Sequence, residues 1–185
     1  CLSFGDDPGT VDYEALYRSR FSVLKQAYKR WAPDEGYQSF QAENRDWLES
    51  YALFMALKNH FDGQEWLKWP KEFRLKDAEA IKEIRGKLRD EIAFWQFCQF
   101  EFFRQWSRLK EYANGKGIQI IGDIPIYAAM DSADTWSEPE VFFLDSEGNP
   151  VEVAGCPPDA FSQAATTEGR RLRPQGTRRP SLPSE

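Results

Sequence analysis

The sequence predicts an α/β fold in which a mostly helical region precedes one buried strand and a β-hairpin. Apolar residues recur every three to four positions along most of the first 115 residues, which indicates amphipathic helices. Residues Ile118–Ile121 (IQII) follow a pair of glycines, as expected of a buried parallel strand. Two short segments, 141–145 and 151–154, then flank a polar loop at 146–149, a pattern typical of a hairpin.

Three stretches carry the helical period. In the first, Asp12 can cap a helix that runs to Trp31, and Pro33 ends it. The second runs from Phe40 to Phe61 and is stopped by an Asp-Gly pair. The third and longest runs from about Lys76 to Asn114.

Four phenylalanines widen the apolar face of the third stretch, as expected of a helix buried between layers: Phe94, Phe97, Phe100 and Phe103. Aromatic stripes at this spacing are more often core than ligand platform. We therefore predict that they form part of the core and not a binding surface.

Composition excludes several classes of protein. The 185 residues are 41% hydrophobic and 29% charged, which is enough apolar material for a packed core. No apolar run approaches the ~20 residues of a membrane-spanning helix, so we expect no membrane partner. The single histidine, His60, excludes a multi-histidine metal centre. Because the sequence starts at Cys1 and not at Met, with no leader pattern, we expect the true start to lie upstream.

The three cysteines are widely spaced and form no CxxC pair: Cys1, Cys98 and Cys156. This pattern disfavours a disulfide framework or a zinc site, and we expect reduced thiols in a cytoplasmic protein.

The chain changes composition after Ser162. Residues 1–162 hold every aromatic residue and a net charge of −9, whereas residues 163–185 have five arginines, no lysine and a net charge of +3. Few apolar side chains remain in this tail, so we predict that it is disordered. Its arginines could form a nucleic-acid arm. The acidic body lacks a matching basic face, so we favour a solvated tail and expect no nucleic-acid partner.

Asp123 is the first candidate functional residue. It follows the predicted buried strand directly, after Gly122, and ligands of parallel α/β proteins bind at the carboxyl ends of strands. A carboxylate there is costly to bury unless it is hydrogen-bonded or lines a solvent-filled cleft. Spacing alone leaves a functional acid and a capping carboxylate equally open.

More acids follow Asp123 in the sequence. Asp131, which opens a DSADTW segment, fits a helix N-cap better than a catalytic acid, and Asp134 fits a first-turn acid. Asp159 differs, because a Pro-Pro pair stiffens its loop and Phe161 follows it, which suits a rigid binding lip. Paired carboxylates cleave or transfer glycosidic bonds, but the spacing does not show which acids lie close together.

These segments form an ordered series that resembles the 4-alpha-glucanotransferases of the amylomaltase, or disproportionating enzyme, family, a branch of the α-amylase superfamily. The series comprises Ile121-Gly-Asp-Ile-Pro-Ile-Tyr127, Asp131-Ser-Ala-Asp-Thr-Trp136, Pro139-Glu-Val-Phe-Phe-Leu-Asp145 and Val153-Ala-Gly-Cys-Pro-Pro-Asp-Ala-Phe-Ser162. Upstream, Phe102–Trp106 and Tyr112–Ile118 match the helix and turn before the third barrel strand of that family. The resemblance covers roughly residues 5–162.

The resemblance implies a (β/α)8 TIM barrel. Residues 1–115 would form a helical insertion and a barrel helix. Residues 116–162 would form the third strand, its long loop and the hairpin, and residues 163–185 a non-family tail. The implied reaction transfers a segment of an α-1,4-glucan to a 4-hydroxyl of glucose or another glucan by a retaining double displacement. It uses maltooligosaccharides, amylose or glycogen-derived dextrins, with no metal and no organic cofactor.

The resemblance also carries residue roles. Asp123 matches the family's acid at the end of the third strand and would hydrogen-bond in the site beside the cleaved sugar, with Pro125 stiffening the strand exit. Asp159 and Ser162 could bond sugar hydroxyls, and Phe161 could offer an apolar face to a sugar ring.

Several family patterns do not occur in this sequence. The nucleophile pattern Arg-x-Asp-His-Phe-Arg-Gly and the acid/base glutamate are missing, and residues after Ser162 do not continue as Gly-Gln-x-Trp-Gly-Asn-Pro. A complete barrel needs about 250 residues. We therefore expect a partial barrel, inactive by itself, whose reading frame shifts near Ser162, with a real truncation as the rival hypothesis.

Two other functions stay open at this point. The chain could be a non-catalytic carbohydrate-binding remnant that uses the lip from Asp159 to Ser162. It could also be an interaction protein that uses its arginine-rich tail.

Overall fold

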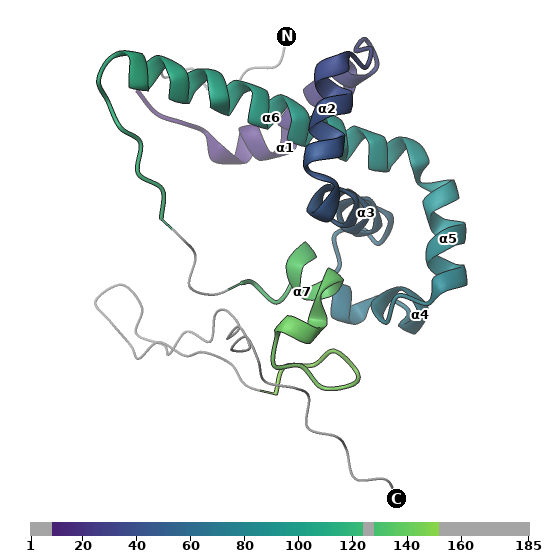
Figure 1. Ribbon diagram of the computed structural model, residues 1–185. Helices are drawn as coiled ribbons and strands as arrows, with labels where there is room; N and C mark the ends of the chain where they lie inside the picture. Colours follow the sequence, from purple (N-terminus) through teal and green to yellow (C-terminus); the bar gives the residue numbers. More distant parts are fainter. Residues whose placement is uncertain (1–8, 124–127, 152–185) are drawn as a thin grey trace, which may run out of the picture. The chain divides into compact units, whose positions relative to one another are not determined.

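The computed structural model describes residues 9–123 and 128–151, and helices dominate this part of the chain (Figure 1). The elements are α1 (Tyr13–Tyr28), α2 (Glu35–Glu43), α3 (Arg45–His60), η1 (Trp66–Lys68), α4 (Lys71–Arg74), α5 (Ala78–Lys87), α6 (Arg89–Gly115), α7 (Ala133–Ser137) and η2 (Pro139–Val141). None of the helices in these two ranges combines the length and apolar character needed to cross a membrane.

The chain folds as two compact units, each built from two separate segments. The first unit contains residues up to Glu49 together with Arg89–Ile120. The second contains Ser50–Leu88 and the residues from Ile121 onward. The candidate site residues of the sequence all belong to the second segment of the second unit.

Helix α1 confirms the predicted role of Asp12. The Asp12 side chain accepts a hydrogen bond from the backbone N–H of Ala15 at 2.9 Å, which satisfies one of the free donors of the first turn. The helix ends at Tyr28, before the expected Trp31, because Arg30 and Trp31 donate to the carbonyl oxygens of Ala27 and Tyr28 in tighter bonds that span three residues.

The predicted helix from Phe40 to Phe61 is two helices, α2 and α3. They meet at Asn44, whose side-chain amide donates to the carbonyl oxygen of Phe40 at 2.9 Å. This competes with continued helical bonding, so the chain turns there. Helix α2 also begins earlier than the predicted Phe40. Its N-cap is Asp34, whose side chain accepts a hydrogen bond from the backbone N–H of Tyr37 at 2.8 Å.

The predicted helix from Lys76 to Asn114 is likewise divided. Asp77 caps α5, and Leu88 separates α5 from α6 with φ −99° and ψ 17°. Gly86, two residues before the break, lowers the helix propensity at that point. Lys76 itself has a positive φ of 55° and lies outside the helix.

Aromatic rings form the core of the first unit. Trp31 contacts Tyr37 and Phe97, with ring centroids 4.7 and 4.9 Å apart, and Tyr37 contacts Phe100 at 5.4 Å. The predicted burial of Phe94, Phe97 and Phe100 is confirmed. Phe103 is an exception because more than a third of it is exposed to solvent.

A second aromatic cluster forms the core of the second unit. The Trp136 ring of α7 lies 5.9 Å from Phe54 on α3 and 6.0 Å from Trp69. Trp69 also contacts Phe61 at 5.4 Å. The cluster therefore joins α7 to α3 and to the short segment after η1.

The expected buried strand at Ile118–Ile121 is not confirmed, because these residues form no strand within the described part of the chain. These residues follow a helix end in which Gly117 has φ 75° and Ile118 N–H donates to the Ala113 carbonyl oxygen at 3.0 Å. The backbone then runs without strand pairing, and Ile121 is 91% exposed. A strand forms only against a neighbour, and the described residues supply none here.

The expected hairpin is confirmed around its loop. Leu144 and Pro150 form an antiparallel bridge, and Asp145 N–H donates to the Asn149 carbonyl oxygen at 2.8 Å. Val151 N–H donates to Phe143 at 2.9 Å. Val141, expected in the first strand, instead ends η2, and residues 152–154 lie outside the described residues.

Candidate active-site segment

Asp123 is the one predicted site residue that the structure describes. It is exposed at the end of the extended run that follows α6. Pro125, Asp159, Phe161 and Ser162 lie outside the described residues. The structure therefore does not test whether these five residues come together.

The described segment between these positions, residues 128–151, is held to α3 and to the turn after it by a lysine. The ammonium group of Lys58 donates to the carboxylate of Asp131 and to the backbone carbonyl oxygens of Gly63 and Gln64, at 3.0 and 3.1 Å. Three acceptors match the three N–H donors of an ammonium group. Asp131 is therefore the partner of a structural lysine and not the predicted N-cap.

Ser132 takes the N-cap position of α7. Its hydroxyl accepts from the N–H of Thr135, and Asp134 lies in the first turn as predicted. Asp131 was a reasonable candidate because aspartate and serine cap helices about equally well. Asp131 binds Lys58, which is distant in sequence, and Ser132 therefore takes the N-cap position.

Trp66 and Thr135 fix the backbone next to Asp131. The indole N–H of Trp66 donates to the carbonyl oxygen of Met130 at 2.6 Å, and the fully buried hydroxyl of Thr135 donates to the same oxygen. The Trp66 backbone N–H donates to the Asp131 carboxylate at 3.2 Å. Residues 130 and 131 are thus held by four separate donors.

Trp136 anchors the next part of the segment. Its indole N–H donates to the carbonyl oxygen of Phe73 at 3.0 Å, and its ring is buried. Lys76 donates to the carbonyl oxygen of Ser137 and lies 5.9 Å from the centre of the Trp136 ring. Burial lowers the pKa of Lys76, although Glu140 and Glu138 act in the opposite direction.

The hairpin is anchored to the same short helix η1. Gly148 has φ 83°, and a Cβ atom at this position would lie 2.8 Å from the Cη2 atom of Trp66. The neighbouring Glu147 accepts from the guanidinium of Arg74 at 2.8 Å. Only glycine suits this position, because it tolerates a positive φ and leaves room for the indole ring.

The carboxylate of Asp145 organises the hairpin loop from within. It accepts from the backbone N–H groups of Glu147 and Asn149, both at 2.8 Å, and from the Asn149 side-chain amide at 3.1 Å. The bond from the Asn149 side chain is the main cause that holds the pKa of Asp145 below its ordinary value of 3.8. This acid therefore has a structural role in the loop.

The residues that sequence reasoning missed are Lys58, Trp66 and Trp136. Each lies in or beside a helix in an ordinary amphipathic pattern, and no local signal marks it as an anchor. Among residues 9–123 and 128–151, no group of three histidine, cysteine or acidic side chains could hold a metal ion. Residues 128–151, which lie between Asp123 and the Pro-Pro pair in the sequence, are thus anchored by hydrogen bonds to Lys58, Trp66 and Phe73.

Comparison with known proteins gives one consistent family. A family model described as 4-alpha-glucanotransferase matches residues 3–165. The 4-alpha-glucanotransferase of Clostridium butyricum is 42% identical over 173 residues, which are 92% of this chain and 36% of that protein. That of Thermus thermophilus is 44% identical over 174 residues, which are 91% of this chain and 35% of that protein.

A solved structure agrees with these relatives. The amylomaltase from Streptococcus agalactiae, in complex with acarbose, has a TM-score of 0.83 and 40% identity, covering 92% of this chain and 35% of that one. The chain therefore spans about a third of the length of the proteins it matches. Since the family model matches most of its residues, the chain belongs to the 4-alpha-glucanotransferase family.

Proposed function

We propose that this chain supplies part of the glucan site of a 4-alpha-glucanotransferase. The reaction transfers a segment of an α-1,4-glucan to a 4-hydroxyl of glucose or another glucan, with retention of configuration. The observation that carries this proposal is the family match over residues 3–165, supported by relatives that are 42–44% identical. The substrates would be maltooligosaccharides, amylose or glycogen-derived dextrins in the cytoplasm.

The chemistry needs two carboxyl groups at the scissile bond. One carboxylate attacks the anomeric carbon and forms a glycosyl ester while the other, as an acid, protonates the leaving oxygen. The second group then acts as a base on the incoming 4-hydroxyl, which displaces the ester and completes the transfer. Excluding water from this step favours transfer over hydrolysis.

Asp123 would serve this reaction as a supporting acid and not as the nucleophile. In barrel enzymes the residues at the carboxyl ends of strands line the site, and Asp123 ends the apolar run 118–121. Asp123 is exposed, and a carboxylate accepts hydrogen bonds of the kind that sugar hydroxyls donate. Asp159 and Ser162 would add further hydrogen bonds, Phe161 a face for a sugar ring, and Pro125 a rigid strand exit.

The anchored segment favours this arrangement. Residues 130–137 are held by hydrogen bonds from Lys58 and Trp66 and from Trp136 to Phe73. The hairpin packs against η1 at Gly148, next to the ring of Trp66. Binding sites work best when rigid elements support the residues that touch the ligand. We propose that this support sets the positions from which Asp123 and the Pro-Pro loop approach the glucan.

The proposed architecture is a (β/α)8 barrel in which residues 118–121 become the third strand once neighbouring strands are present. Residues 1–115 would be the helical insertion and barrel helix, 116–162 the strand with its loop, and 163–185 a tail outside the family pattern. The present sequence has no Arg-x-Asp-His nucleophile pattern. We therefore propose that the 185-residue chain by itself does not transfer glucans.

A chimera tests the proposal. In the Thermus thermophilus relative, residues 3–162 of this chain replace the segment that they match, and glucose release from maltotriose is measured. We expect activity from the chimera and none from the 185-residue chain. A chimera that melts cooperatively but releases no glucose overturns the proposed function, and glucose release by the 185-residue chain overturns its inactivity.

The same chimera tests Asp123. Asp123→Asn should lower kcat by about 100-fold, the usual size of one lost transition-state contact. The matched control is Asp134→Asn, which removes an exposed acid from the first turn of α7 and should leave the rate within about twofold. Equal rates for both variants would show that Asp123 does not contribute to the site, and would leave the proposed activity of the family unaffected.

A further inference from the structure

A small pocket in the second unit is lined by two cationic side chains. Its volume is about 220 Å³, below the range of about 300 Å³ and more that is usual for drug-sized ligands. Helices α3, α5 and α7 contribute to its lining, which includes Ser50, Leu53, Lys76, Ile81, Arg85 and Ser137. Among the described residues no carboxylate lines it. The pocket therefore combines positive charge, hydroxyl groups and aliphatic surface in a space suited to a small ligand.

The ammonium group of Lys76 forms no ion pair with any carboxylate in the described part of the chain. It donates to the carbonyl oxygen of Ser137 and lies 5.9 Å from the centre of the Trp136 ring. Burial lowers the pKa of Lys76, and Glu140 and Glu138 oppose this effect only in part. A partly buried cation of this kind is stabilised by an anion that binds beside it.

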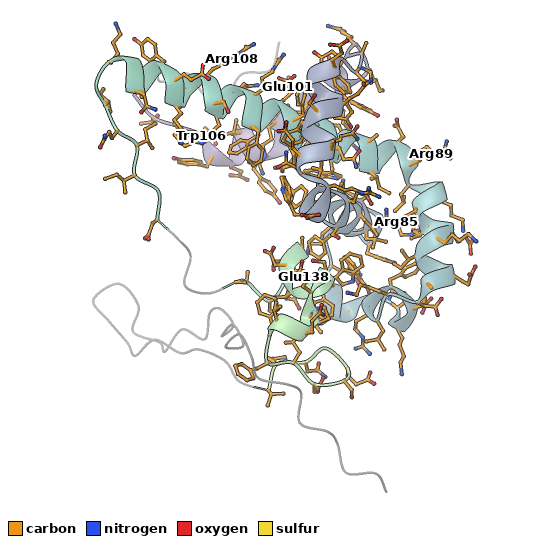
Figure 2. All side chains as sticks on the ribbon, in the orientation of Figure 1. Arg85, Arg89, Glu101, Trp106, Arg108 and Glu138 are labelled. Atoms are coloured by element: carbon orange, nitrogen blue, oxygen red, sulfur yellow. The ribbon has the colours of Figure 1, made fainter. Side chains whose placement is uncertain are left out.

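Arg85 supplies a second positive charge to the same pocket. It lies in the second half of α5 (Figure 2), and Lys76 lies just before this helix, so one short segment presents both cations. A guanidinium has five N–H donors and can therefore bind an oxyanion while it keeps other partners. Ala78, the first residue of α5, also lines the pocket, and the positive end of a helix dipole favours an anion there.

The lining favours a phosphate monoester over other small anions. Two cations match a phosphate group, which carries a charge of about −1.5 to −2 near pH 7, whereas a carboxylate carries only one negative charge. The hydroxyls of Ser50 and Ser137 add donors for the remaining phosphate oxygens. Leu53 and Ile81 line the pocket as well, so the carbon atoms of an ester would meet apolar surface.

We propose that this pocket binds the phosphate group of a small phosphate monoester. Lys76 and Arg85 would hold the phosphate oxygens, and the hydroxyls of Ser50 and Ser137 would donate further hydrogen bonds. The aliphatic side chains would contact the carbon atoms of the ester. Asp123 does not line the pocket, and the proposal is independent of the proposed glucan transfer. Bound ligand would join α5 to α7 and so favour the folded state of the second unit.

An NMR titration tests the site. Butyl phosphate or inorganic phosphate is added to the ¹⁵N-labelled 185-residue chain at constant pH and ionic strength, with chloride as the balancing anion. We expect saturable shifts of the backbone amides of Ala78, Ile81 and Ser137 with both compounds. Butyl phosphate should bind at least about fourfold more tightly than inorganic phosphate, which is the effect of burying one methylene group.

Matched variants assign the binding to the two cations. Arg85→Gln and Lys76→Asn each remove one positive charge, and asparagine tolerates the positive φ of 55° at position 76. Each variant should bind butyl phosphate about tenfold more weakly or worse, because a hydrogen bond between charged groups is lost. Lys82→Gln removes a charge from an exposed position of α5 outside the pocket and should change the affinity by less than about twofold.

Three results overturn the proposal. One is the absence of saturable shifts at the three pocket amides. Another is equal weakening by Lys82→Gln and by the pocket variants, which would show that phosphate only screens surface charge. A third is equal affinity for the two compounds, which would reject the ester and leave inorganic phosphate as the ligand. The amide spectrum of each variant shows whether the second unit stays folded, and Arg85→Gln alone decides if Lys76→Asn unfolds it.

Discussion

Lys58 on α3 donates a hydrogen bond to the carboxylate of Asp131, and this ion pair joins two positions that are 73 residues apart in the chain. The same ammonium group also holds the carbonyl oxygens of Gly63 and Gln64. One side chain therefore fixes both the turn after α3 and the start of the segment that leads to α7.

Removing this lysine should destabilise the second unit. Lys58→Met leaves the Asp131 carboxylate and two carbonyl oxygens without their shared donor, and we expect a loss of about 1–3 kcal/mol, the usual range for hydrogen bonds to charged groups. Urea unfolding of the 185-residue chain measures the free energy. Lys82→Met, at an exposed position of α5, is the control and should change stability by less than about 0.5 kcal/mol. Equal losses in both variants would show that the anchor contributes nothing.

Among the described glycines of the second unit, Gly148 should be the least replaceable. Gly148→Ala combines a positive φ with a Cβ atom 2.8 Å from the ring of Trp66, whereas Gly63→Ala has a positive φ and open space around it. The left-handed conformation alone costs about 1–2 kcal/mol, and overpacking adds about 1–3 kcal/mol. We expect Gly148→Ala to lose clearly more free energy of unfolding than Gly63→Ala. The opposite order would mean that the hairpin does not rest on Trp66.

Asp145 should titrate below its ordinary pKa, and Asn149 should be the main cause. A carboxyl group whose folded-state pKa is depressed adds stability above its unfolded pKa, and this is lost as the pH falls through the folded value. In Asn149→Ala the NMR titration midpoint of Asp145 should rise toward 3.8. The unchanged backbone donors of Glu147 and residue 149 should keep it slightly lower. A titration midpoint that does not change would show that the Asn149 side chain is not what lowers the pKa of Asp145.

Cys98 should be a poor nucleophile in the folded protein. Burial raises the pKa of its thiol to about 12, with a further contribution from Glu91. At pH 8 the thiolate fraction is then on the order of one in ten thousand, so modification should be at least about 1,000-fold slower than for an ordinary thiol. The rate with a thiol reagent is measured in a Cys1→Ser, Cys156→Ser background, before and after unfolding in urea. Native and unfolded rates within tenfold of each other would contradict the burial of this side chain.

Local signals were sufficient where short-range chemistry decides the structure. Asp12 caps α1 as predicted because a capping carboxylate needs only a donor three residues away. The burial of Phe94, Phe97 and Phe100 followed from helical spacing alone. The hairpin loop was predictable for the same reason, since its ends lie six residues apart at Leu144 and Pro150.

Long-range partners explain where prediction from sequence fell short. Asp131 satisfied every local criterion for an N-cap, but its partner Lys58 lies 73 residues earlier. The run Ile118–Ile121 has the composition of a buried strand, but composition does not supply the neighbouring strand that it needs. Of the predicted site the structure describes Asp123, which is exposed after this run, and the roles of all five residues stay predictions.

The uneven covering of α6 has a dynamic consequence. The helix has 27 residues and is about 40 Å long, yet among the described residues its buried rings lie between Phe94 and Phe100, and the partly exposed Phe103 adds contacts to Phe40 and Trp47. Local opening costs least where few buried contacts are lost. Backbone amides near Phe97 should therefore exchange with deuterium only when the first unit unfolds, whereas those near Leu109 should exchange through fraying from the Gly117 end. One continuous helix would thus behave as two segments of different stability.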